Sequence, residues 1–205
     1  MEETKKNSRW DAKKTRTLTG MAMLTAIVVA LELFAGFSGI KFGPFNITLA
    51  LAPIIVGAAL YGWKAGAWLG FVFSVVVCFE PATASFMTIS APATIATVIV
   101  KGTVAGLVGG LVYIAIEKKN KYIAVLISGL VMPLVNTGIF LLGCWAFFLD
   151  TVRAWGEGFG YTNVFAYMIF GLVGLNFLVE FAINFILGSA IAMIIKIVKK
   201  QNANA

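Results

Sequence analysis

Long apolar runs recur along this chain, and they constrain its fold more than any other feature. The longest run extends from Val164 to Val198, and as a helix it would be about 50 Å long. A bilayer core of roughly 30 Å needs about 20 helical residues per crossing. Charged residues are only 12% of the chain, against about a quarter in soluble domains. The sequence therefore predicts an all-α integral membrane protein.

Six transmembrane helices forming one bundle fit the 205 residues. A basic tail (1–17) precedes the single membrane domain (18–198), and a short tail (199–205) follows it. The connection from Gly36 to Pro44 is predicted to be non-helical, Tyr61 to Lys64 to be a tight turn, and Glu80 to Pro92 to be a loop or a short re-entrant segment. A last loop is expected over 150–163. The final helix must tilt, protrude, or break near Gly171 and Gly174. The predicted helices are 18–37, 47–60, 65–79, 94–116, 122–149 and 164–198.

Basic residues indicate the orientation. Threading six crossings puts thirteen Lys and Arg residues on one side and only Lys41 and Arg153 on the other. Because Lys and Arg concentrate in cytoplasmic segments, both termini are expected in the cytoplasm of a multi-pass, bacterial plasma-membrane protein. The same distribution explains the net charge of +7 without a nucleic-acid partner; membrane lipid is the expected surrounding.

Several kinds of chemistry are disfavoured by what the sequence lacks. Histidine is absent, and Cys78 and Cys144 lie in apolar runs without a CxxC motif, so neither a disulfide nor a metal site is expected. No phosphate-binding glycine loop is present. We therefore expect no cofactor and no enzymatic activity, and any uphill transport must draw its energy from a partner or an ion.

Small residues recur at four-residue spacing in three places. Ala22, Ala26 and Ala30 share one face of the first helix, and two glycine stripes repeat the pattern at 62, 66, 70 and at 102, 106, 110. Such spacing lets another helix approach closely. Each stripe is interpreted either as internal packing or as a docking face.

Ionisable groups inside apolar helices are costly and mark functional candidates. Glu32 and Lys101 are expected at comparable depth, where they would form an ion pair or where Lys101 would offer its donors to a substrate carboxylate. The two interpretations are compatible if Glu32 holds Lys101 until substrate arrives.

A polar stripe of Asn176, Glu180 and Asn184 lies along the last helix, at similar depth to Asn136 on the fifth. Interhelical hydrogen bonds or ligand contacts would each explain this stripe. Asn176 and Asn136 are the predicted substrate contacts, while Glu180 and Asn184 are predicted to be structural.

Aromatic residues gather near the expected outer ends of the helices. They are interpreted either as an interfacial belt or as lids over an occluded solute. Trp145 and Trp155 are kept as candidate substrate contacts. The full set is Phe42, Phe45, Phe86, Trp145, Trp155, Tyr161 and Tyr167.

The alanine stripe, the segments Pro53–Gly57 and Gly62–Gly66, and Asn176–Glu180 together resemble the substrate-binding S-components of energy-coupling factor (ECF) vitamin transporters. The hairpin and Asn136–Thr137 look most similar to the pantothenate-type branch. The resemblance implies that the chain binds a water-soluble vitamin from outside and docks on a T-component that bears two ATPase subunits. It also implies that Ala22, Ala26 and Ala30 form the docking face.

Two other functions remain open at this point. A structural scaffold of the cell envelope would use the interior polar residues only to hold helices together. A solo ion-coupled carrier would need no ATPase partner. An intramembrane enzyme using Glu32 and Glu180 is disfavoured because no nucleophile accompanies them.

Overall fold

The computed structural model describes every residue except 1, 38–40, 43–44, 47–48 and 204–205, and it describes the side chains of 14–36, 49–174 and 176–201. Helices dominate the described chain, as predicted, together with one two-stranded hairpin. The elements, in order, are α1 (Glu2–Phe37), β1 (Lys41–Phe42), β2 (Phe45–Asn46), α2 (Leu51–Tyr61), α3 (Trp63–Val77), α4 (Pro81–Glu117), α5 (Lys121–Phe147), α6 (Leu149–Gly158), α7 (Val164–Ala166), the π-helix η1 (Tyr167–Gly174) and α8 (Leu175–Ala203).

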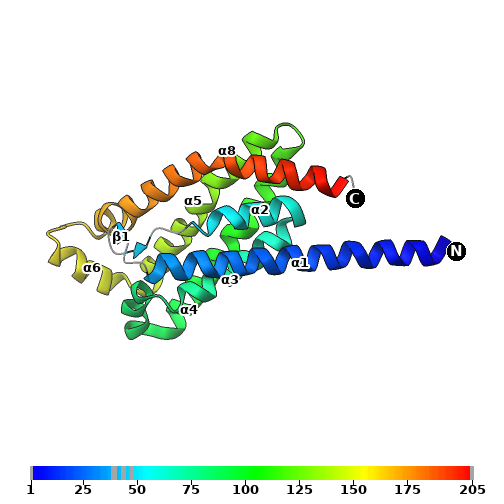
Figure 1. The fold of residues 1–205 in the computed structure, drawn as a ribbon. Coiled ribbons are helices and arrows are strands. Elements are labelled where there is room, and N and C mark those ends of the chain that lie inside the picture. The colour runs from blue at the N-terminus through cyan, green and yellow to red at the C-terminus, as the bar shows by residue number, and fades with distance from the viewer. Residues whose placement is uncertain (1, 38–40, 43–44, 47–48, 204–205) are drawn as a thin grey trace.

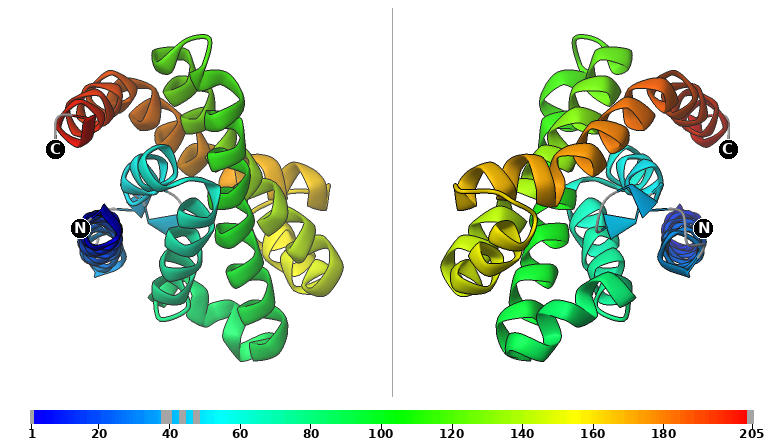
Figure 2. Two further views of the ribbon diagram at one scale, coloured as in Figure 1. Left: turned by 90° about the vertical axis from the view of Figure 1, so that its right-hand side faces the viewer. Right: turned by 90° about the vertical axis from the view of Figure 1, so that its left-hand side faces the viewer.

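Among the described residues, four helical segments are long and apolar enough to cross a membrane: Lys14–Gly36, Pro81–Glu117, Lys121–Phe147 and Asn176–Gln201. The apolar helices α2 and α3, with 11 and 15 residues, are shorter than the roughly 20 residues of a full crossing. Helices α1 and α8 run in similar directions, α4 and α5 are inclined to them, and both termini emerge at the same end of the bundle (Figure 1). The end-on views show α1 at the periphery of the bundle (Figure 2).

From α1 to α3 the chain follows the prediction, except that the basic segment before Leu18 is helical and continuous with α1. Helix α1 ends at Phe37, the predicted end of the first helix, so Gly36, which was also assigned to the connection, is helical. The connection that follows contains β1 and β2, paired antiparallel. Between α2 and α3 lies the single residue Gly62, whose φ of 92° favours glycine. That conformation explains the very tight turn.

The prediction of a loop from Glu80 to Pro92 is wrong, because this segment is the N-terminal part of α4. Pro81 occupies the first turn of the helix, where its missing N–H is not needed. Ser90 leaves helical geometry at φ −155° and ψ 99°. Pro92, two residues later, cannot donate a backbone hydrogen bond and displaces the preceding turn. The result is one helix with a sharp kink.

The loop predicted over 150–163 is also partly wrong, because residues 149–158 form the short helix α6. Its buried positions, Val152 and Gly156, follow the buried Phe148 at four-residue intervals, which is the spacing of one helical face. The helix ends among three closely spaced glycines, and Gly160 has a φ of 82°. Pro133 is accommodated inside α5.

The long apolar run at the C-terminal end is irregular where Gly171 and Gly174 lie. Residues 167–174 form the π-helix η1, which leads into α8. Asn163 begins this stretch by accepting hydrogen bonds from the backbone N–H groups of Phe165 at 2.8 Å and Ala166 at 3.4 Å, as a helix cap does. At the far end, Lys199 of α8 forms a 2.6 Å salt bridge with Glu117 of α4.

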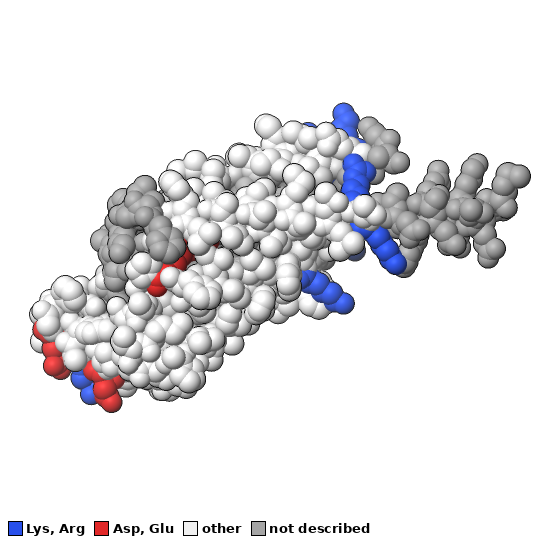
Figure 3. All heavy atoms as spheres, turned by 60° about the horizontal axis from the view of Figure 1, so that its bottom comes forward, with Lys and Arg blue, Asp and Glu red and all other residues white. Residues whose placement is uncertain are grey.

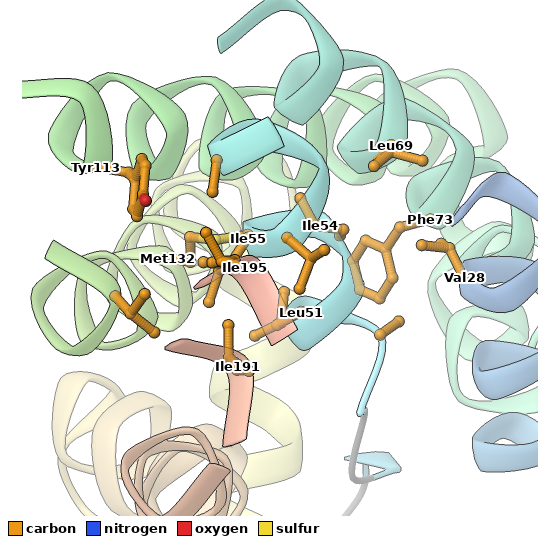
Figure 4. Close-up of a cluster of buried hydrophobic side chains, with 14 of the residues drawn as sticks. Val28, Leu51, Ile54, Ile55, Leu69, Phe73, Tyr113, Met132, Ile191 and Ile195 are labelled. Atoms are coloured by element: carbon orange, nitrogen blue, oxygen red, sulfur yellow. The ribbon is translucent and has the colours of Figure 1, made fainter. Parts of the chain in front are cut away.

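The apolar core fills the half of the bundle that contains the α2–α3 hairpin. Leu51, Ile54 and Ile55 of α2 meet Met132 of α5 and Ile195 of α8, and all five are at most 1% exposed. Figure 4 shows these side chains converging from different helices. The core therefore fixes α2 between α5 and α8.

Helices α3 and α4 touch through their backbones. A Cβ atom added at Gly66 would lie 2.5 Å from the carbonyl oxygen of Gly106, and one added at Gly110 would lie 2.9 Å from the Cα of Trp63. Gly70 and Gly102 approach each other in the same way. Of the two interpretations given to the glycine stripes, internal packing is the one that this geometry supports.

Basic side chains gather at the end of the bundle where the chain begins and ends, whereas acidic side chains predominate at the opposite end (Figure 3). The exposed residues Lys118, Lys119 and Lys121 belong to the first group, and Asp150 and Glu157 to the second. This arrangement agrees with the charge asymmetry read from the sequence.

Candidate substrate-binding site

A polar cavity lies between the helices, on the side of the core away from the α2–α3 turn. Its walls come from α1, α3, both parts of α4, α5, η1 and α8. The lining residues are Glu32, Phe73, Val77, Glu80, Ala82, Thr83, Phe86, Thr94, Thr97, Val98, Lys101, Asn136, Thr137, Phe140, Phe148, Val173, Asn176 and Glu180. Four of the six predicted substrate contacts, Lys101, Asn136, Asn176 and Glu32, therefore line one cavity.

The cavity contains about 70 Å³ of space that the centre of a water molecule can reach. One water needs about 10–15 Å³ of such space, so the cavity has room for several waters or for a small solute. Its walls combine apolar rings with a few charged and amide groups, which is the usual make-up of a ligand site. The arrangement differs from a bundle packed solidly with side chains.

Lys101 presents the positive charge of this cavity. Its Nζ lies 5.2 Å from the centre of the Phe140 ring, close enough for a cation–π contact. The salt bridges among the described residues are Arg153–Asp150 and Lys199–Glu117. The Glu32–Lys101 ion pair, one of the two interpretations of these residues, is thus not formed at salt-bridge distance. The carboxylates of Glu32, Glu80 and Glu180 line the same cavity.

Hydrogen bonds within α8 link the three residues of its polar stripe. Asn176 donates a 3.2 Å hydrogen bond from Nδ2 to Glu180 Oε1. Asn184 donates from Nδ2 to the backbone carbonyl of Glu180 at 2.9 Å. Both bonds lie within α8, whereas the two interpretations of the stripe were interhelical hydrogen bonds and ligand contacts. Asn176 and Glu180 face the cavity, and the buried Asn184 does not line it.

An aromatic cluster closes one side of the cavity. Phe86, in the N-terminal part of α4, is 5% exposed and lies edge-on to three rings: Phe140 at 5.6 Å, Phe148 at 5.3 Å and Trp155 at 5.3 Å between ring centres. Such edge-to-face pairs are favourable. Because Phe86, Phe140 and Phe148 also line the cavity, the cluster connects the cavity wall to α6.

The remaining predicted aromatic contacts lie elsewhere. Trp155 reaches the site only through Phe86 and is not a lining residue, and Trp145 is 54% exposed on α5. Tyr161 and Tyr167 pack against each other, 5.4 Å between ring centres. The side chains of Phe42 and Phe45 lie outside the described residues.

Sequence reasoning missed several lining residues. Thr97 and Lys101 are four residues apart and therefore share one face of α4, so this spacing could have identified Thr97. Glu80 was missed because its segment was predicted to be a loop. Phe86 was among the aromatic residues interpreted as a belt or as lids, but it was not selected as a substrate contact. Glu180, predicted to be only structural, also lines the cavity.

The alanine stripe lies on the opposite face of α1 from the cavity. Ala22, Ala26 and Ala30 are all exposed, whereas Glu32 is 3% exposed and Val28 fully buried. The stripe therefore forms a smooth strip on the outside of the bundle.

These features define the class of the protein: it is a multi-pass helical membrane protein with a cavity between its helices that is lined by apolar, charged and amide side chains. More particularly, the chain belongs to the family of substrate-specific components of ECF transporters, whose family model matches residues 16–199. Its family thus assigns it to vitamin uptake in bacteria, together with an energy-coupling module, and not to an enzyme class.

A curated relative is the pantothenic acid transporter PanT of Lactococcus lactis subsp. cremoris (strain MG1363). The two sequences are 28% identical over 192 residues, which cover 83% of this chain and 89% of that transporter. The similarity thus extends through most of both chains.

Proposed function

We propose that this chain is the pantothenate-binding component of an ECF importer. The observation on which the proposal rests is the ammonium group of Lys101, which lines a solute-sized cavity and forms no salt bridge among the described residues. Pantothenate carries one carboxylate, and a buried ammonium group is a strong partner for it. The similarity to the pantothenic acid transporter of Lactococcus lactis supports the same substrate.

The proposed topology has six crossings, with α2 and α3 as short spans and α7, η1 and α8 together as the last. The basic end of the bundle lies in the cytoplasm. The cavity then lies in the outer half of the plasma membrane, below the aromatic cluster around Phe86. Solute enters from outside.

The exposed strip Ala22, Ala26 and Ala30 is the proposed docking face for the T-component. Small side chains let a partner helix approach closely in lipid, where packing replaces the hydrophobic effect as the main attraction between helices. Because α1 lies at the edge of the bundle (Figure 2), a partner reaches this strip without displacing another helix.

A ligand panel with Lys101→Met tests the substrate assignment. At a pantothenate concentration 100 times its Kd, the purified parent should gain about 2.7 kcal/mol of stability, since ligand binds only the folded state. Lys101→Met should weaken pantothenate binding about 100-fold, as expected when one partner of a buried charge pair is removed. Pantothenyl alcohol, which lacks the carboxylate, should bind both proteins with nearly the same affinity. Thermal shift and titration calorimetry in detergent measure these effects.

Lys64→Met is the matched control. Lys64 is an exposed lysine at the N-terminal end of α3, whereas α3 lines the cavity near its C-terminal end. The substitution should leave pantothenate affinity unchanged. A parent that no member of a vitamin panel stabilises would support the envelope-scaffold alternative. Uptake by cells without T-component and ATPases would support the solo carrier.

Phe86→Ala should accelerate release of bound pantothenate about tenfold or more. The change removes three edge-to-face contacts, each worth about 0.5–1.5 kcal/mol, from the cluster that covers the cavity. Filter-binding chase of radiolabelled pantothenate measures the rate. Phe79→Ala is the control, since Phe79 is 76% exposed. An unchanged rate in Phe86→Ala would show that solute leaves by another route.

A further inference from the structure

Three neutral cavity-lining residues, Thr97, Asn136 and Asn176, have buried side-chain oxygens without hydrogen-bond partners among the described residues. The Asn176 amide is already linked to Glu180 through its nitrogen, whereas Thr97 and Asn136 lie on the two helices that carry Lys101 and Phe140. Thr97 on α4 and Asn136 on α5 are 7% and 8% exposed, and neither Thr97 Oγ1 nor Asn136 Oδ1 has a partner in the structure. Both residues line the cavity. A buried polar atom left unsatisfied destabilises a protein by about 1–3 kcal/mol, so such atoms call for an explanation.

The positions of the two residues relate them to Lys101. Thr97 precedes Lys101 by four residues, one helical turn or about 6 Å along α4, on the same face. Asn136 precedes Phe140 by four residues on α5, and the Phe140 ring lies beneath the Lys101 ammonium group. One wall of the cavity, formed by α4 and α5, thus offers a positive charge and two neutral oxygens a turn apart.

We infer that Thr97 and Asn136 form a subsite that accepts hydrogen bonds from the uncharged polar groups of a solute whose carboxylate binds Lys101. This inference rests on the proposed function. Pantothenate fits the order of groups, because an amide N–H stands three bonds from its carboxylate carbon and two hydroxyl groups follow. Its N–H and hydroxyl donors supply what the two oxygens lack, so the subsite selects a hydroxylated amide over other small carboxylates.

The test is an affinity cycle with two variants and two ligands. Thr97→Val keeps the shape of the side chain and removes the hydroxyl, and Asn136→Leu removes the amide. Each should weaken pantothenate binding about tenfold, as loss of one buried hydrogen bond does. A pantothenate analogue with both hydroxyls replaced by hydrogen should bind the parent more weakly, and at least one variant should bind it with the affinity of the parent.

Thr103→Val and Ser128→Ala are matched controls. Thr103 Oγ1 and Ser128 Oγ also lack partners, on the same two helices, but neither residue lines the cavity. Both controls should bind pantothenate like the parent. If the controls weaken binding as much as Thr97→Val does, the effect is structural and the inference is overturned.

The outcomes separate this inference from the proposed function. Pantothenate binding that depends on Lys101 but is unchanged in Thr97→Val and Asn136→Leu would overturn the subsite alone. Equal losses for pantothenate and its deoxy analogue in both variants would do the same. A parent that does not bind pantothenate would remove the proposed substrate and the subsite together. Circular dichroism and size-exclusion profiles of each variant exclude misfolding as the cause.

Discussion

Gly106→Val is expected to destabilise the protein by about 3 kcal/mol or more, the upper range for overpacking a closely packed core. A Cβ at Gly106 would lie 2.9 Å from the carbonyl carbon of Gly66 and closer still to its oxygen. Backbone atoms cannot rotate away as a side chain can, so α3 and α4 would have to separate. Thermal unfolding in detergent measures the loss.

Ligand binding should fall with stability in this variant. Lys101 and Gly102 are adjacent in α4, and Gly102 packs against Gly70 of α3. Moving α4 away from α3 therefore displaces the ammonium group and widens the cavity on the side of Phe73 and Val77. We expect pantothenate affinity to fall at least tenfold even in the folded fraction.

Gly138→Ala is the control for the glycine contact. Gly138 also lies inside a helix, but a Cβ there would meet nothing within 4 Å. Alanine is the better helix former by about 0.5–1 kcal/mol, so this substitution should leave stability unchanged or raise it slightly. Equal destabilisation by Gly106→Val and Gly138→Ala would refute the close-contact argument.

The apolar runs predicted the helices well because lipid leaves the backbone few alternatives. Prediction failed where the local residues conflict with the tertiary setting. Pro81 and Pro92, with Ser and Thr between them, indicated a loop, yet the helix there buries Phe86 among aromatic rings. Three closely spaced glycines near Gly158 indicated a loop, although residues 149–158 form the short helix α6.

The candidate site was predictable only where a residue is costly in lipid. Glu32, Lys101, Asn136 and Asn176 were identified because charged or amide groups inside apolar helices require partners, and all four line the cavity. Threonine is ordinary in membrane helices, so Thr97 gave no comparable signal, and Phe86 was only one of seven aromatic residues interpreted as a belt or as lids. Their roles depend on which helices meet, which the sequence alone did not specify.

Ala26→Leu is expected to abolish uptake while leaving pantothenate affinity within about twofold of the parent. Ala26 is exposed on α1, on the face away from Glu32, so a larger side chain there does not reach the cavity. It would, however, hold a partner helix away from the whole strip, because close approach depends on small side chains along one face. Uptake of labelled pantothenate by cells containing the complete transporter tests the expected loss of transport. Titration of the purified protein in detergent tests the expected retention of affinity.

Ala190→Leu makes the comparison specific to α1. Ala190 is an exposed alanine on α8, at a similar distance from the basic end of the bundle, and its replacement adds the same apolar volume to a lipid-facing surface. It should support normal uptake, and the T-component should copurify with it but not with Ala26→Leu. Loss of binding in Ala26→Leu would mean that the strip supports the fold of the cavity; normal uptake would mean that the T-component docks elsewhere. Glu32 and the three alanines lie on opposite faces of α1. If Ala26→Leu abolishes uptake but keeps pantothenate binding, the Glu32 face is assigned to the cavity and the alanine face to docking of the T-component.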